Sequence, residues 1–306
     1  MKATVPADLG GERADLIVAR VAEVSRAIAR RMLEEGAATV DGACVLPSRR
    51  VAAGSVLEMQ IPEPAPPLEA EDVPFEVRFE DAFLAVVDKP AGVVVHPGAG
   101  RRTGTLAAGL LHRWPGIEGI GDEDRWGIVH RLDRDTSGLL VVALDQGTYV
   151  RLRSALGRRV IGRHYLALVH GREVPPSGTI EAPLGRDPRH PTRFRADRLG
   201  RPARTHYRAL AAWHRAGLSL LEVTLETGRT HQIRVHAASI GHPVAGDPVY
   251  GRGGDGMPRL FLHAARIEFE HPISGDPVRV GSPLPTDLAR VLDGLGDPDE
   301  GSVPEQ

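Results

Sequence analysis

The chain has 306 residues, 42% of them hydrophobic and 25% charged, which suffices for a catalytic domain and a smaller accessory domain. Its one cysteine, Cys44, excludes an intrachain disulfide and any metal site built from several cysteines. The longest apolar run, GLLVVAL at residues 138–144, is too short to span a bilayer, and residues 1–15 lack the apolar segment of a secretory signal. We therefore expect a cytoplasmic protein with no membrane partner.

The formal net charge of −2 conceals an uneven distribution. Residues 91–285 carry 27 basic and 18 acidic side chains, whereas residues 62–90 carry 2 and 8 and residues 286–306 carry 1 and 6. All basic residues except Lys2 and Lys89 are arginine, which suits bidentate contact with phosphate. The same preference also arises from genomic base composition, so the charge pattern permits a nucleic-acid partner without requiring one.

Residues 13–61 have the pattern of a compact module of helices and strands. Two helices are predicted, the second between an N-cap at Ser25 and a stop at Gly36. A hairpin with Asp-Gly in its turn is predicted over residues 38–45, and a further strand over residues 56–61. Three arginines of the second helix lie away from its apolar face, where they could contact either phosphates or only water: Arg26, Arg30 and Arg31.

Residues 62–72 are acidic and proline-rich, which predicts an extended, solvated linker. Between residues 73 and 285, strands and helices mix without regular alternation, so we expect a catalytic domain of the α+β class with a mixed, largely antiparallel sheet. A disordered tail is expected over residues 293–306. The clearest strands are predicted at residues 77–88, 128–133, 138–144, 165–169 and 218–225.

The segment GIVHRLDRDTSGLLVVAL, residues 127–144, places two acidic residues in a polar turn between apolar strands. A carboxylate at a strand end beside Arg131 can stay ionised and act as a nucleophile or stabilise a cation. Asp133 and Asp135 are the two candidates. Taken by itself, an Asp-Arg-Asp turn is more often a salt-bridged loop.

A second polar segment, residues 225–251, contains a helix predicted to begin after an N-cap at Thr230 and to end at Gly241. Arg234 lies one position off the apolar face of this helix, where it could point into a cleft or simply into solvent. Free backbone donors at the helix start could hold an anion. Three side chains accompany them: Arg229, His231 and Gln232.

A third segment, residues 161–171, has Tyr165 at the start of a strand. Tyrosine there usually packs in the core, but its ring could also stack on a base. Residues 251–256, GRGGDG, match a dinucleotide-binding pattern but precede a strand-like segment instead of a helix. The 13 histidines show no spacing typical of zinc ligands, so we predict no metal site.

In chain order, five segments resemble the RluA/RluD-type pseudouridine synthases, and the resemblance extends over about residues 13–285. They are DKPAGVVVHPGAG (88–100), HRLDRDTSG (130–138), GRHYLALVHG (162–171), TGRTHQIRVH (227–236) and GHPVAGDPVYG (241–251). The resemblance implies an S-four-like RNA-binding domain over residues 13–61 and a catalytic domain with a central cleft. It also implies an RNA substrate, large-subunit ribosomal RNA in the RluD-like branch, with transfer RNA as the alternative.

The resemblance further implies roles for single residues. Asp133 is the implied catalytic aspartate, Tyr165 the active-site tyrosine, and Arg234 the arginine paired with the aspartate. Leu262 is implied to line the uracil pocket. Arg163 stands where the family usually has lysine. The positive charge is kept, but an exact ion-pair geometry need not survive the exchange of lysine for arginine. In the implied reaction, the bond between ribose and uracil moves from a nitrogen of the base to its carbon 5. No atoms or electrons are gained overall, so the resemblance implies no cofactor.

Two further classes of protein fit parts of the sequence. One is a non-catalytic RNA-binding protein, which a substitution at Asp133, Tyr165 or Arg234 would have favoured. The other is a nucleoside or glycoside hydrolase using the same carboxylate, for which no second acid is evident. The synthase hypothesis leaves open whether a glycal or a covalent adduct forms, and we expect a monomer.

Overall fold

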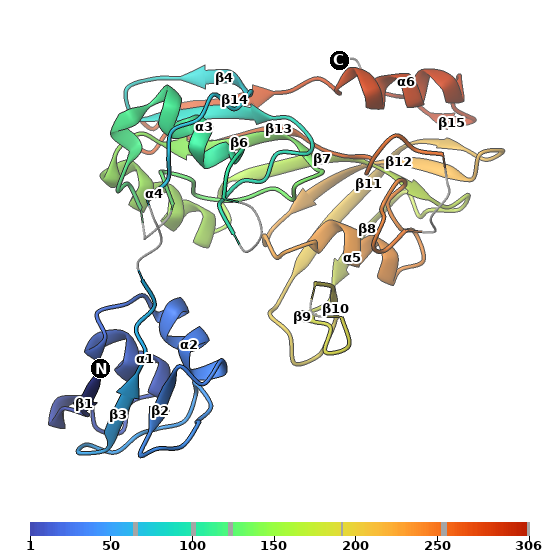
Figure 1. The fold of residues 1–306 in the computed structure, drawn as a ribbon. Helices are drawn as coiled ribbons and strands as arrows, with labels where there is room; N and C mark the ends of the chain where they lie inside the picture. Colours follow the sequence, from blue (N-terminus) through green and yellow to red (C-terminus); the bar gives the residue numbers. More distant parts are fainter. Residues whose placement is uncertain (64–66, 99–101, 122–124, 191, 252–255, 305–306) are drawn as a thin grey trace. The chain divides into compact units, whose positions relative to one another are not determined.

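The computed structural model describes the chain except residues 64–66, 99–101, 122–124, 191, 252–255 and 305–306 (Figure 1). Contacts divide the chain into two compact units, Met1–Pro67 and Leu68–Gln306. Parts of the predicted linker, of the HPGAG segment, of the GRGGDG string and of the predicted tail lie outside the described residues. Among the described residues, no helix combines the length and the apolar composition needed to cross a membrane.

In its described part, the first unit packs two helices on a three-stranded antiparallel sheet of order β1-β3-β2 (Figure 1). The Ser25 hydroxyl caps the second helix by accepting a hydrogen bond from the Ile28 amide at 3.3 Å. Gly36, just past the helix, has a φ of +76°, which favours glycine. The elements are β1 (Lys2–Thr4), the short 3-10 helix η1 (Ala7–Leu9), α1 (Ala14–Val21), α2 (Arg26–Glu34), β2 (Ala38–Val40) and β3 (Val56–Met59).

The first unit differs from its prediction at the hairpin and at its start. Across the predicted hairpin only an isolated bridge joins Val40 to Ala43, and β2 pairs with β3 instead. The turn residue Asp41 is drawn to β3, because its amide donates to the Val56 carbonyl at 2.8 Å and its carboxylate accepts from the Val56 amide at 2.7 Å. The unit also begins before residue 13, because β1 pairs with β3.

The second unit is built on one large sheet, which has ten strands among the described residues. Its main order is β15-β11-β12-β7-β13-β6-β5-β4, with β14 on β13 and β8 on β11 (Figure 1). All pairings are antiparallel except β13 with β6, which confirms the predicted α+β class with a largely antiparallel sheet. The strands are β4 (Glu76–Glu80), β5 (Leu84–Lys89), β6 (Ser137–Ala143), β7 (Gly162–His170), β8 (Ser177–Glu181), β11 (Arg204–Trp213), β12 (Leu218–Leu225), β13 (Leu262–Glu270), β14 (Pro277–Gly281) and β15 (Glu300–Gly301); β9 (Leu184–Arg186) and β10 (Phe194–Ala196) pair separately.

Helices pack on both faces of this sheet. Alternate residues of β7 serve two cores, since successive side chains of a strand point to opposite faces. Ala167 and Val169 join the core that includes α3, α4 and α5, whereas Leu168 joins the core that includes α6. The helices are α3 (Leu106–Arg113), the short η2 (Pro115–Ile117), α4 (Gln146–Gly157), α5 (Gln232–Ser239) and α6 (Thr286–Leu295).

Three predictions for the second unit were wrong in detail. Residues 77–88 form two strands, because the Asp81 carboxylate accepts from the amides of Phe83 and Leu84 and turns the chain. Residues 128–133 form no strand and make only one isolated bridge. The predicted disorder from residue 293 is contradicted by α6, which continues to Leu295, and by β15, which pairs with β11. The unit therefore extends beyond the predicted limits of 73 and 285.

Candidate active site

Asp133 lies in the turn that leads into β6. The turn is held by its backbone, since the Thr136 amide donates to the Asp133 carbonyl at 3.3 Å. Gly138, at the start of β6, has a φ of +112°, and a Cβ there would lie 2.3 Å from the Ala264 carbonyl oxygen. This close approach brings the Asp133 turn beside β13. The Asp133 side chain is 17% exposed and accepts a hydrogen bond from Arg234 at 3.2 Å.

Arg234 projects from α5 and is fixed by a second carboxylate. Its Nε and Nη2 donate to the two oxygens of Asp247 at 2.7 and 2.8 Å, and the Asp247 side chain is fully buried. Burial opposes the charge of Arg234, but the hydrogen bonds and charges of Asp247 and Asp133 raise its pKa above the usual value. Burial likewise opposes the charge of Asp247, yet its bonds with Arg234 lower its pKa. Arg234 is therefore a fixed cation beside Asp133.

Tyr165 and Leu262 come from neighbouring strands and face the same pocket. In the register of β7 against β13, Tyr165 pairs with Ala264 and Leu262 with Ala167. Burial raises the pKa of the Tyr165 hydroxyl, which keeps that hydroxyl protonated. All eight predicted catalytic and substrate-binding residues line this one pocket: Arg131, Asp133, Tyr165, Arg229, His231, Gln232, Arg234 and Leu262.

The start of α5 differs from its prediction. The helix begins at Gln232, and its N-cap is His231 in a left-handed conformation with a φ of +56°, so the prediction of Thr230 as N-cap was wrong. The His231 ring instead bonds the Tyr250 hydroxyl through Nδ1 at 2.9 Å and lies 4.0 Å from Asp133. Burial, opposed by the charge of Asp133, lowers the pKa of His231.

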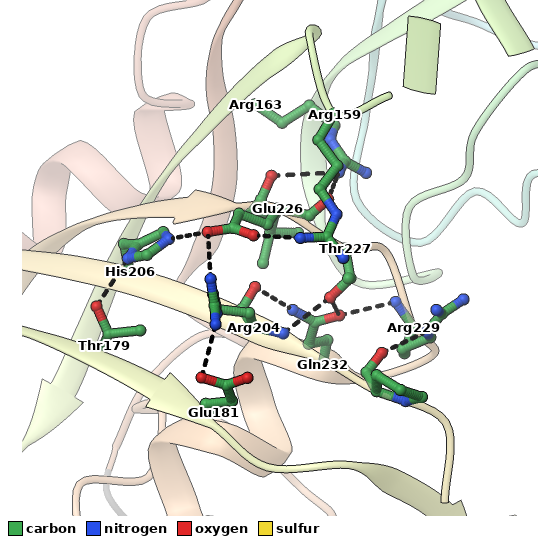
Figure 2. Close-up of polar contacts among 12 residues, drawn as sticks. Arg159, Arg163, Thr179, Glu181, Arg204, His206, Glu226, Thr227, Arg229 and Gln232 are labelled. Carbon is green, nitrogen blue, oxygen red and sulfur yellow. Dashed lines mark hydrogen bonds and ion pairs between the residues drawn. The ribbon is translucent and has the colours of Figure 1, made fainter. Parts of the chain in front are cut away.

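Gln232 was predicted to contact substrate, but its amide is occupied within the protein (Figure 2). Its carbonyl oxygen accepts from the Thr227 hydroxyl at 2.8 Å and from the Arg229 amide at 3.0 Å. Its nitrogen donates to the Arg204 carbonyl at 3.0 Å and to the Thr205 hydroxyl at 2.9 Å. Gln232 therefore supports the loop that carries Arg229 and His231.

The arginines predicted to bind RNA have different surroundings. In the first unit, Arg26 donates to Asp15 at 3.0 Å, Arg30 pairs with Glu34 at 2.8 Å, and Arg31 is exposed. In the second unit, Arg229 donates to the Pro202 carbonyl at 3.0 Å. The side chains of Arg26 and Arg30 are 54% and 64% exposed, whereas Arg229 is partly buried.

Sequence reasoning missed two residues that hold the site together. Asp247 lay in a quoted segment, GHPVAGDPVYG, but only the fold shows that it anchors Arg234. Lys89 is fully buried and donates to the carbonyls of Pro90, Val93 and Arg134 at 2.7 to 3.0 Å. Burial lowers the pKa of Lys89 to about 7. Two signals were available: Lys89 lies in the quoted segment DKPAGVVVHPGAG, and it is one of only two lysines in the chain.

Comparison with known proteins identifies the family of the chain. A family model described as RNA pseudouridylate synthase matches residues 84–239. The chain is 42% identical over 98% of its length to a protein of Nitrosomonas europaea named ribosomal large subunit pseudouridine synthase D, of which 89% is covered. It is 48% identical over 96% of its length to an uncharacterized RNA pseudouridine synthase of Chloroflexus aurantiacus, of which 93% is covered.

A solved structure is similar as well. Human RNA pseudouridylate synthase domain containing 1 has a TM-score of 0.56 and 26% identity, covering 76% of this chain and 98% of that one. The similarity in sequence spans both units, and the similarity in structure extends over most of the chain. As its sequence segments predicted, the chain belongs to the RNA pseudouridine synthase family of isomerases.

Proposed function

We propose that the chain converts uridine to pseudouridine in large-subunit ribosomal RNA, with Asp133 as the catalytic carboxylate. The observation that carries the proposal is the Asp133–Arg234 pair, in one pocket with Tyr165 and Leu262. A ribosomal large-subunit substrate is the one named for the Nitrosomonas europaea relative, to which the chain is similar over 98% of its length. In this proposal the protein acts as a monomer and without a cofactor.

The reaction breaks the bond between ribose C1′ and uracil N1, turns the base, and joins C1′ to C5. Asp133 attacks or stabilises the electron-poor C1′, as carboxylates do in glycoside hydrolysis. Arg234, fixed by Asp247, orients Asp133 by donating a hydrogen bond to its carboxylate. The ring of Tyr165 stacks on the uracil and the side chain of Leu262 forms an apolar wall, so that the detached base is retained and water is kept out.

RNA binding in this proposal uses both units. The first unit acts as the S-four-like RNA-binding domain, with Arg26, Arg30 and Arg31 facing phosphates. In the second unit, Arg131 and Arg229 hold the phosphates that flank the extruded nucleotide. Because binding releases counterions from the RNA, the affinity should fall as the salt concentration rises.

Release of tritium from carbon 5 of uridine tests the reaction. An unmodified large-subunit ribosomal RNA transcript with that label should lose tritium to the full chain, because joining C5 to C1′ displaces the C5 hydrogen. D133N should bind the same transcript and release none. A labelled transfer RNA pool serves as the second substrate. Release from transfer RNA alone would move the target there, and release from neither RNA would overturn the proposal.

A further inference from the structure

Arg163 is a buried cation in the pocket. It lies on β7 two residues before Tyr165, and both side chains are buried on the same face of the strand. Among the described residues, no carboxylate lies within ion-pair distance of its guanidinium, which meets only backbone carbonyls. A buried charge without a counterion is strongly unfavourable, so its presence indicates a functional requirement.

The contacts of Arg163 fix its position without neutralising it. Its Nη2 donates to the carbonyls of Leu225 and Glu226 at 3.2 and 3.4 Å, at the end of β12. Its Nε is buried and has no hydrogen-bond partner among the described residues. Its Nη1 lies so near Gly228 that a Cβ at that position would approach it to 2.8 Å. The guanidinium thus retains donors that the protein does not use.

The acid whose backbone Arg163 contacts, Glu226, has its carboxylate turned to other partners. Glu226 offers Arg163 only its backbone carbonyl (Figure 2). Its carboxylate binds three other side chains at 2.6 to 3.4 Å: Arg159, Arg204 and His206. On another side, burial and then the charge of Arg163 lower the pKa of His130 to about 3, so His130 is neutral. Neither neighbour adds a charge that balances the guanidinium.

The other arginines of the pocket differ from Arg163. Arg234 lies between two carboxylates, Asp133 and Asp247, and its charge is balanced. Arg131 is exposed and Arg229 is only partly buried, which suits contact with phosphates. Of the described arginines that line the pocket, Arg163 alone is both buried and without a carboxylate partner.

We propose that Arg163 is a further catalytic residue that stabilises the detached uracil as an anion. This inference rests on the proposed isomerisation. When the C1′–N1 bond breaks, its electron pair remains on the base, whose negative charge spreads over N1, O2 and O4. A fixed, buried guanidinium stabilises that developing charge more than it stabilises neutral uridine. The charge disappears when C5 attacks C1′ and forms the new bond. The C5 proton then leaves to solvent and N1 takes up a proton, so protons balance and no co-reactant is needed.

A matched pair of variants separates the charge of Arg163 from its position. R163Q keeps amide donors for the carbonyls of Leu225 and Glu226 but removes the charge, whereas R163K keeps the charge. With tritiated large-subunit ribosomal RNA, R163Q should lower kcat about 100-fold and change KM less than about threefold. R163K should remain within about tenfold of the unmodified chain. R151Q is the control, because exposed Arg151 lies outside the pocket and also donates to a backbone carbonyl, that of Pro272 at 3.1 Å.

A second substrate tests the charge directly. In RNA that carries 5-fluorouridine, fluorine stabilises the base anion, so the enzyme depends less on its own cation. The reaction of 5-fluorouridine is followed in a single turnover as its disappearance from nuclease digests. The factor by which R163Q slows this reaction should be at least about tenfold smaller than the factor by which it slows the reaction of uridine. A merely structural role of Arg163 predicts the same loss on both substrates.

The outcomes are distinguishable. An active unmodified chain with equal losses for R163Q on both substrates, or with none, overturns the role of Arg163 and leaves the proposed function standing. An unmodified chain that releases no tritium overturns both. If thermal unfolding shows that R163Q does not fold, the rate losses on uridine and on 5-fluorouridine are compared for R163K instead. The rate loss of R163K should again be smaller on 5-fluorouridine.

Discussion

Each unit contains a cluster in which one buried charge bridges two opposite charges, but the signs are reversed. In the first unit the buried group is Asp15, which accepts hydrogen bonds from Arg13 and Arg26 at about 3.0 Å. The two arginine side chains remain 39% and 54% exposed. The first cluster therefore presents positive charge to the solvent.

In the second unit the buried group is Arg234. Its partners are Asp247, which is fully buried, and Asp133, which stays accessible from the pocket. This cluster presents negative charge. The comparison teaches that the outer members decide what a cluster can do, because exposed guanidinium groups suit phosphates and an accessible carboxylate suits an electron-poor sugar carbon.

Removing the inner anchor of the second cluster should have the largest effect on stability. D247A leaves the Arg234 guanidinium buried with one carboxylate instead of two, and should lower the free energy of unfolding by about 3–5 kcal/mol. Urea denaturation followed by tryptophan fluorescence measures this, since Trp114, Trp126 and Trp213 all lie in the second unit. D287N, which breaks the more exposed pair with Arg259, is the control and should lose at most about 1 kcal/mol. Equal losses would contradict the role of Asp247 as anchor.

The first cluster should be less sensitive, because its arginines can turn to water when the carboxylate is removed. D15N should lower the free energy of unfolding of the first unit by about 1–2 kcal/mol, measured by far-ultraviolet circular dichroism. The comparison requires that the exposed arginines turn to solvent in D15N. A loss of unfolding free energy as large as that of D247A would show that they do not.

The clusters should also respond to acid. Hydrogen bonds from Arg13, against burial, lower the pKa of Asp15, so its contribution is complete above its unfolded pKa and is lost as the pH falls toward the folded value. Between about pH 5 and about pH 3, the stability of the unmodified first unit should fall more steeply than that of D15N. Parallel curves would mean that Asp15 has the same affinity for protons in both states.

The smallest effect is expected from exposed arginines of the first unit. R31Q removes one outward charge, should weaken RNA binding at physiological salt a fewfold and should reduce the salt slope by about one. Because Arg31 lies outside the pocket, kcat at saturating RNA should not change. Filter binding across a salt series measures both the affinity and its dependence on salt. An unchanged salt slope would show that Arg31 does not belong to the RNA interface.

Much of the fold was predictable because it is encoded locally. The N-cap at Ser25, the glycine at position 36 and the strand β12 follow from short stretches of sequence. The strand pairing of β2 and the ordered end of the chain depend instead on distant partners, β3 and β11, which no local pattern contains.

The same division holds at the active site. The eight predicted residues line one pocket. They could be predicted together because the family resemblance implied which segments of the sequence form the active site. Asp247 and the lack of a counterion for Arg163 could not be predicted, because both depend on contacts between segments far apart in the chain. Thr230 was misassigned because a good capping residue does not exclude a left-handed residue after it.

The central claim is that the outward carboxylate of the second cluster, Asp133, performs the chemistry. The most direct measurement compares D133N with D135N, since Asp135 lies in the same turn but pairs with exposed Arg134. On tritiated large-subunit ribosomal RNA, D133N should release tritium at least about 1000-fold more slowly than the unmodified chain, while D135N stays within about tenfold. Full activity of D133N with loss in D135N would contradict the assignment.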